Sequence, residues 1–349
     1  MRRLGRRRLA TPLVASIGVL TLLLIVAAGV GSVRIPAGDV LAAVGRGVWG
    51  SLAEVRIGPE AEATRVIDTI VWQIRLPRVA LAALVGAALG LAGAGFQGVF
   101  RNPLADPYLL GAASGAGFAA SLAIVSGGAF GLGLLGVPLA AFVGAAATVA
   151  LVVALARRGW SLPIVPLVLA GVVVGSCLAA GTSFVLLAAR EQAAGVLTWL
   201  LGSLAFASWA RVGTLLPPVL VAGAVLITAA RSLDVLQLGE RAAAQLGLRV
   251  EWLKLTVVAA GTLATAAAVS VAGVIGFVGL VVPHAVRLAL GPDHRRLVPV
   301  SAVWGAGFMV LADLVARTVI APAELPVGVV TALVGAPFFL LLLRRRVAP

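Results

Sequence analysis

Long apolar runs separated by short polar breaks fill most of the chain. A helix needs about 20 apolar residues to cross a bilayer, and ten windows of roughly that length occur here. The break between the seventh and eighth windows, VAGVIGFVGL, contains three glycines and is compatible with irregular backbone enclosed by protein. The pattern predicts one domain, residues 1–349, that is an all-α polytopic membrane protein with helices near 11–31, 79–97, 108–126, 134–156, 163–186, 212–230, 252–272, 274–291, 297–316 and 327–343.

Cationic clusters occupy alternate breaks, beginning with MRRLGRRRLA before the first run. If that first segment is cytoplasmic, the breaks on its side of the membrane carry eighteen of the 27 lysine and arginine residues. Six of the other nine lie in the long segment 32–78, and long segments have little influence on topology. We therefore expect both termini to be cytoplasmic, and we read the long first run as a span rather than a cleavable signal.

Composition supports a lipid-embedded chain. It is 61% hydrophobic and 11% charged, whereas a soluble domain carries about 25% charged residues. So few charges cannot cover a globule with polar surface, so lipid must surround most of the protein. The net charge of +14 does not indicate a nucleic-acid partner, because the arginines are dispersed in short clusters and form no single basic face.

Two polar segments are long enough to have roles of their own. Residues 32–78 are partly amphipathic and are expected to lie on the outer surface. Residues 231–251 alternate leucine and alanine with charged residues at helical spacing, which predicts a short amphipathic helix on the cytoplasmic face. From periodicity alone this helix fits a place in the lipid interface as well as docking on a soluble partner.

The insert RNPLADP, residues 101–107, interrupts the apolar pattern between the second and third spans. Its two prolines each remove a backbone donor and disfavour helix in the preceding residue. Asn102 and Asp106 are suited to satisfy helix-end groups that lipid would leave unpaired. The insert is therefore predicted to be a stiff turn on the cytoplasmic side, with contact to a partner left open.

The residues of an enzyme are missing. There is no GxxxxGK[ST] loop for ATP, and the two histidines, His284 and His294, have no partners at metal-ligand spacing, so we expect no metal site and no cofactor. An ion-coupled carrier usually has an acid in mid-span, but Asp313 lies near a span end, four residues before Arg317. A transporter of this kind would need energy from another subunit, while a membrane scaffold without a pathway remains an alternative.

Five ordered stretches carry a resemblance to a known family. They begin with RLPRVALAALVGAALGLAGAGFQGVFRNPLADPYLLGAASGAG at residue 75 and LVLAGVVVG at 167, and continue with LGERAAAQLGL, GVIGFVGLVVPHAVRLALGPDHRRLVP and ADLVARTVIAPAELPVGVVTALVGAPFFLLLLRR. Together they resemble the permease subunits of ABC importers for iron–siderophores, haem and vitamin B12, the FecCD type. The resemblance implies a type II ABC importer permease fold, a second copy of the chain, two separate ATP-hydrolysing subunits, an extracytoplasmic binding protein and residence in the cell membrane.

The resemblance also implies roles for particular residues. Arginines at the outer ends of spans two and nine are expected to dock the binding protein: Arg75, Arg78 and Arg317. Glu324 is the expected partner of Arg317. Coupling to the ATPase falls to the cytoplasmic segment, at Gly239, Glu240, Arg241, Leu246 and Gly247. The pathway falls to span five, with an apolar gate at Ile164 and Val165 and a small-residue wall at Gly171, Gly175 and Ser176. A structural use was the alternative in each case: arginines anchoring helix ends, and small residues packing helices.

Overall fold

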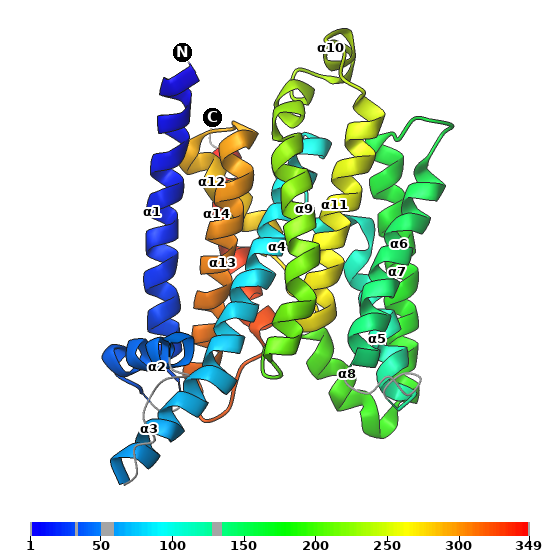
Figure 1. Ribbon diagram of the computed structural model, residues 1–349. Coiled ribbons are helices and arrows are strands. Elements are labelled where there is room, and N and C mark those ends of the chain that lie inside the picture. Colours follow the sequence, from blue (N-terminus) through cyan, green and yellow to red (C-terminus); the bar gives the residue numbers. More distant parts are fainter. Residues whose placement is uncertain (1, 32–33, 50–58, 128–134, 348–349) are drawn as a thin grey trace.

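Apolar helices form a bundle in which most of them run roughly side by side (Figure 1). The computed structural model describes residues 2–31, 34–49, 59–127 and 135–347. Among these residues, seven helices are long and apolar enough to cross a membrane, and three shorter apolar helices complete a set that matches the ten expected spans. The set comprises α1 (Arg2–Gly29), α4 (Leu76–Phe100), α5 (Ala112–Val125), α6 (Gly136–Ala156), α7 (Ile164–Ala188), α9 (Trp209–Leu236), α11 (Val250–Ala272), α12 (Val278–Leu290), α13 (His294–Thr318) and α14 (Val327–Val347).

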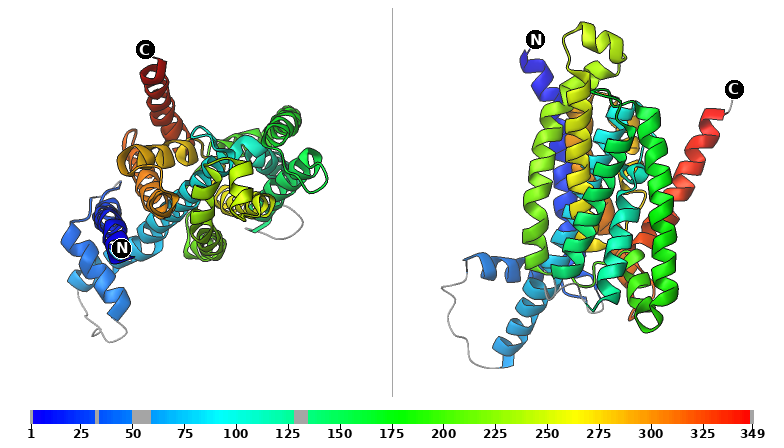
Figure 2. Two further views of the ribbon diagram at one scale, coloured as in Figure 1. Left: turned by 90° about the horizontal axis from the view of Figure 1, so that it is seen from above. Right: turned by 90° about the vertical axis from the view of Figure 1, so that its right-hand side faces the viewer.

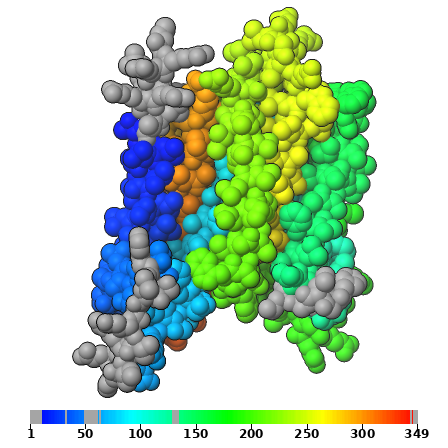
Figure 3. Space-filling view, viewed as in Figure 1, coloured from blue at the N-terminus to red at the C-terminus, as the bar shows by residue number. Residues whose placement is uncertain are grey.

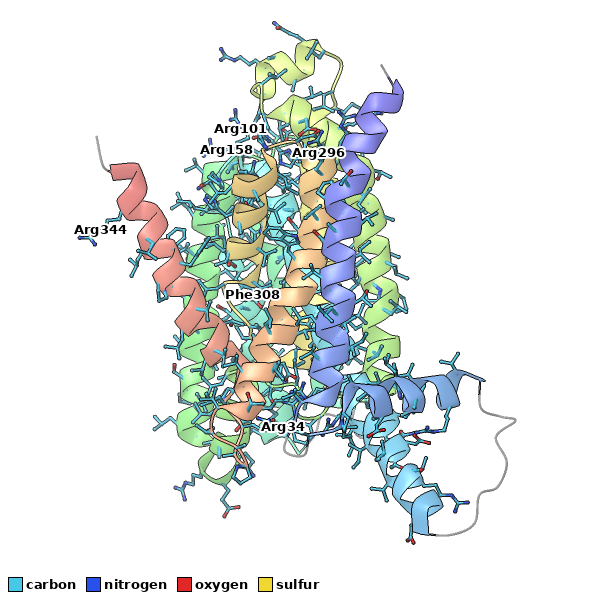
Figure 4. The ribbon with its side chains drawn as sticks, turned by 90° about the vertical axis from the view of Figure 1, so that its left-hand side faces the viewer. Arg34, Arg101, Arg158, Arg296, Phe308 and Arg344 are labelled. Carbon is cyan, nitrogen blue, oxygen red and sulfur yellow. The ribbon has the colours of Figure 1, made fainter. Side chains whose placement is uncertain are left out.

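The two ends of the bundle differ. α1 begins and α14 ends at the same end, where the short helix α10 (Glu240–Gln245) also lies, and we call this the α10 end (Figures 1 and 2). The opposite end, the α2 end, carries α2 (Ala37–Trp49). Arg101, Arg158 and Arg296 lie at the α10 end, and Arg34 lies at the α2 end (Figure 4). The first three cations, all predicted to lie on one side of the membrane, therefore share one end of the molecule.

The second span begins earlier than the hydrophobic pattern predicts. α3 (Pro59–Thr69), η2 (Ile70–Arg75) and α4 follow one another without interruption, so one apolar helical stretch runs for 37 residues from Thr64 to Phe100. Much of what was expected to be surface segment is thus continuous with the span, while α2 lies across the end of the bundle (Figure 1). Residues 32–33 and 50–58 of that segment lie outside the described residues.

Glycines allow the central helices to approach closely. α4 and α11 are the most deeply buried of the long spans, and α4 packs against α9, α11, α12 and α13. A Cβ on Gly86 of α4 would collide with the carbonyl oxygen of Gly305 in α13, and one on Gly93 would collide with that of Gly279 in α12. Because lipid gives helices no hydrophobic reason to associate, such close van der Waals packing holds the bundle together.

The irregular backbone anticipated after the seventh span is present at residues 273–277, between α11 and α12. The hydroxyl of Tyr108 donates to the carbonyl oxygen of Ile275 at 3.0 Å, and the amide of Gln97 donates to that of Leu280 at 3.2 Å. These side chains give the interrupted backbone the partners that a bilayer core cannot supply. The break is therefore an internal feature of the bundle.

The 101–107 insert forms the stiff turn that its prolines predict. The side chain of Asn102 accepts from the amide of Leu104 at 3.0 Å. The carboxylate of Asp106 accepts from the amide of Tyr108 at 2.7 Å and caps the short 3₁₀ helix η3 (Pro107–Leu110). The expected helix-capping role is confirmed for Asp106, whereas Asn102 stabilises the turn itself, and the turn fixes where η3 enters the bundle.

Candidate functional site

The helix α10 projects as a separate knob beyond the other helices (Figure 3). It is bounded by Gly239, with φ of 104°, and Gly247, with φ of 84°, which are left-handed conformations that favour glycine. Ala243 is buried on the inner side of the knob, whereas Leu246 is 67% exposed. The five predicted coupling residues are thus brought together in one protrusion: Gly239, Glu240, Arg241, Leu246 and Gly247.

The 101–107 turn lies beside the base of this knob. A Cβ on Gly239 would be 3.8 Å from a terminal nitrogen of Arg101, and the Arg101 side chain is exposed. Arg241 on α10 is exposed as well. The α10 end therefore presents an apolar tip, Leu246, with arginines close by, which is a surface suited to a soluble protein that carries acidic groups.

Lys254 forms an ion-pair cluster beneath the knob. Its side chain is 1% exposed, and its Nζ lies 2.8 Å from Glu240 Oε2, 3.2 Å from Glu251 Oε1 and 3.3 Å from the carbonyl oxygen of Leu162. Glu251 Oε2 in turn accepts from the amide of Leu162 at 2.6 Å. The sequence motifs assigned this residue no role of its own. The signal that it carried was its rarity, because the single lysine of a chain with 26 arginines falls inside an apolar run.

A cavity of about 580 Å³ opens between α7, η3 and α12. The predicted wall residues Gly171, Gly175 and Ser176 line it, together with Asp106 and Tyr108 of the turn. Gly171 also packs tightly, since a Cβ there would collide with the backbone of η3. The small residues of α7 therefore both pack against η3 and line a cavity.

The two predicted gate residues lie apart from this cavity, at the start of α7. Val165 is 69% exposed, whereas Ile164 is partly buried against the core. Both follow Leu162 and Pro163, so the Lys254 cluster holds the backbone immediately before them. The predicted gate residues and the predicted wall residues both lie on α7, but Val165 and Gly171 are more than one helical turn apart.

One face of α7 is left uncovered by the rest of the described residues. Val173 is 67% exposed, Phe184 71% and Leu187 82%. Apolar exposure is ordinary for a helix in lipid, but the cavity beside this face also contains the carboxyl group of Asp106. A carboxyl group of a membrane protein faces protein or water rather than lipid. The open side of the cavity therefore requires a cover of protein or a water-filled space.

The three predicted docking arginines gather at the α2 end, but their side chains are mostly buried. Arg75 is 5% exposed and donates to the carbonyl oxygens of Ala28 and Gly29 at 2.8 and 2.7 Å. Arg317 is 8% exposed and donates to that of Ala27 at 2.6 Å. These are among the last carbonyls of α1, which have no partner within their own helix. Arg75 and Arg317 thus cap α1.

Arg78 is the docking candidate nearest to solvent. Its guanidinium lies 2.9 Å from Asp313 and 2.8 Å from Glu324, and 13% of the side chain is exposed. Arg317 lies 3.4 Å from Asp313, so the i, i+4 pair expected from the sequence forms. Glu324 binds Arg78 and not Arg317, the partner guessed from the sequence. Hydrogen bonding to Arg78 lowers the pKa of Glu324, whose carboxylate is 40% exposed.

Comparisons with known proteins agree with this architecture. A model of the FecCD transport family matches residues 19–345. The cobalamin import system permease protein BtuC of Halobacterium salinarum is 48% identical, covering 80% of this chain and 74% of the relative. The hemin transport system permease protein HmuU of Yersinia pestis is 42% identical, covering 79% and 84%. A solved structure described as an inward-facing conformation of a metal-chelate type ABC transporter has a TM-score of 0.82 at 29% identity, covering 96% of this chain and 99% of that chain.

Proposed function

This chain belongs to the FecCD transport family, a family of ABC transporter permeases, and from this premise we propose that it carries a metal chelate into the cytoplasm with energy from ATP hydrolysed by a separate subunit. The chain is a multi-pass membrane protein, which in a bacterium lies in the inner membrane. The permease subunits of its family are not themselves catalytic. An iron–siderophore complex is the first candidate cargo, and haem and cobalamin are the next. The knob α10 is the observation that carries the proposal.

The ATPase subunit docks on the α10 end in this proposal, which makes that end cytoplasmic. The knob is short and protrudes alone, and two left-handed glycines fix its entry and exit. A helix that lay in the lipid interface would place an apolar face along the membrane, whereas α10 projects away from the bundle (Figure 1). Leu246 and Arg241 are the proposed contacts, with Glu240 facing back into the chain.

A second copy of the chain covers the exposed face of α7 in this proposal. Two copies would enclose the Asp106 cavity between them, and a two-fold arrangement would give one central pathway with two equivalent walls. Gly171, Gly175 and Ser176 are then part of the wall. Ile164 and Val165 form the apolar seal where the pathway reaches the α10 end.

The binding protein docks at the α2 end in this proposal, around Arg78 and Glu324. Arg75 and Arg317 support that surface from below, since their guanidinium groups cap α1. An acidic group on the binding protein would compete with Glu324 for Arg78. Contacts of this type mainly steer and orient the partner, so docking is expected to weaken as salt concentration rises.

The first test is uptake into liposomes that contain this chain with its ATPase, and the binding protein outside. The binding protein is loaded in turn with an iron–siderophore, haem or cobalamin, and uptake is followed with and without ATP. We expect ATP-dependent uptake of one ligand, and loss of most of it with Arg241→Glu. Arg65→Glu is the matched control, because Arg65 is an exposed arginine on α3 near the other end.

Each other outcome contradicts a stated part of the proposal. Uptake that does not depend on ATP would favour an ion-coupled carrier. ATP hydrolysis that the loaded binding protein does not stimulate, together with no uptake, would favour a membrane scaffold. An equal effect of Arg241→Glu and Arg65→Glu would remove α10 as the ATPase contact.

A further inference from the structure

Lys254 joins two segments that the proposed function assigns to different tasks. Its Nζ lies 2.8 Å from Glu240, the first residue of the knob α10. The same Nζ lies 3.3 Å from the carbonyl oxygen of Leu162, two residues before the gate helix α7 begins at Ile164. The contacts are separated by 14 and 92 residues in the chain. One side chain thus bridges the ATPase contact and the gate.

The bridge is anchored on both sides. Glu251, one turn before Lys254 on α11, binds the Lys254 ammonium through one oxygen at 3.2 Å and the amide of Leu162 through the other at 2.6 Å. The carbonyl and the amide of Leu162 are therefore both held from α11. Trp160 and Trp252 add a ring contact between the same two segments, with centroids 6.4 Å apart. Movement of α11 or α10 relative to this turn would have to break or carry along these bonds.

The buried ammonium of Lys254 needs more partners than a residue that only fills space. A buried ammonium loses its hydration and needs acceptors for its three donors, and Lys254 has three: Glu240, Glu251 and Leu162. Apolar residues of similar volume often replace buried ion pairs without loss of stability. A purely structural position inside an apolar run would be filled more simply by a leucine or a methionine.

We propose that Lys254 is the positioning residue that transmits movement of α10 to the inner gate at Ile164 and Val165. The inference rests on the proposed function, since it needs an ATPase on α10 and a gate at the start of α7. When the ATPase displaces α10, Glu240 pulls the Lys254–Glu251 pair, and this pair shifts the backbone at Leu162. Without the ammonium, α10 still binds the ATPase, but the gate no longer follows it.

The test separates coupling from folding by measuring uptake for each ATP hydrolysed. Lys254→Met is introduced into the full transporter in liposomes, where methionine keeps much of the side-chain volume. We expect ATP hydrolysis within about twofold of the unaltered protein and uptake per ATP lowered about tenfold, a typical coupling effect between sites. Arg46→Met is the matched control, because it removes the Arg46–Asp68 ion pair at the α2 end and should leave uptake per ATP unchanged.

A second readout follows the gate directly. A cysteine replaces Val165 in a Cys177→Ala background, which removes the chain's one native cysteine. Its labelling rate by a maleimide is measured with and without ATP and vanadate. We expect nucleotide to change the rate in the otherwise unaltered chain and to leave it unchanged when Lys254→Met is added. Glu251→Ala, which removes the anchor at Leu162, replaces Lys254→Met if that variant does not assemble, with the same expectation.

The outcomes distinguish the inference from the proposed function. No ATP-dependent uptake by the unaltered transporter would contradict the proposed function before Lys254 is tested. If that uptake is present, unchanged uptake per ATP and unchanged gate labelling in the variant would overturn the inference alone. Loss of uptake and ATP hydrolysis in proportion to the amount of assembled transporter would also overturn it, since that is the result of a structural role.

Discussion

Replacing Arg317 with methionine tests whether this arginine serves the fold or a partner. The substitution removes the donor to the carbonyl oxygen of Ala27 while keeping most of the side-chain volume. An unpaired buried carbonyl costs about 1–3 kcal/mol. The larger penalty for an uncompensated buried charge does not apply, because Asp313 keeps Arg78 at 2.9 Å. We therefore expect the free energy of unfolding to fall by about 2 kcal/mol.

The assay is equilibrium unfolding in mixed micelles, with the fraction of denaturing detergent raised stepwise and helicity followed by circular dichroism. Arg65→Met is the control, because Arg65 is exposed on α3 and an exposed substitution usually changes stability by less than about 0.5 kcal/mol. Affinity for the binding protein is measured on the same two variants. Equal unfolding free energies for Arg317→Met and Arg65→Met, with affinity lost only in the former, would refute the capping role and restore the docking role.

Two further predictions concern packing and charge. Gly86→Ala should destabilise the bundle by about 1–3 kcal/mol because its Cβ collides with α13. Gly213→Ala, where a Cβ meets nothing within 4 Å, should instead stabilise α9 slightly. Unfolding in mixed micelles compares the two variants, and equal effects would contradict the close-packing argument. Because binding to Arg78 lowers the pKa of Glu324, the stability from this pair is present above the ordinary carboxyl pKa of 4.5 and is lost as pH falls through the lowered value. Thermal unfolding between neutral and acid pH should show a loss below about 1 kcal/mol that Glu324→Gln abolishes, since the carboxylate is partly exposed.

The sequence predicted features that depend on local pattern. Apolar windows gave the ten spans, and the glycines near residue 275 marked the break between α11 and α12. Asp106 caps η3, and Asn102 accepts from the backbone two residues on, as their residue types suggest. The amphipathic segment around α10 was identified from its spacing. In each case the signal is local: the spacing of residue types within a short stretch of sequence carries the information.

Features that depend on long-range partners were not predictable. Arg78 binds Asp313 and Glu324, which are 235 and 246 residues further along the chain. The burial of Arg75 and Arg317 was also not predictable, because their carbonyl partners on α1 are far away in the sequence. Without those partners, an arginine at the end of a span is expected to be an interfacial anchor. The helical stretch from Thr64 to Phe100 contains Arg75 and Arg78, and their long-range partners offset the cost of these charges within it.

The position of charge in this chain follows one rule at both ends of the bundle. Cations that face the aqueous ends are exposed arginines, such as Arg101 on a turn and Arg241 on α10. Two cations within the bundle each hold elements together: Arg317 joins α13 to α1, and Lys254 joins α11 to α10 and to the turn before α7. Because a buried charge is costly unless it is paired, each such contact resists separation of the elements that it joins. A transporter moves by shifting helices as units, so these few ion pairs decide which helices move together.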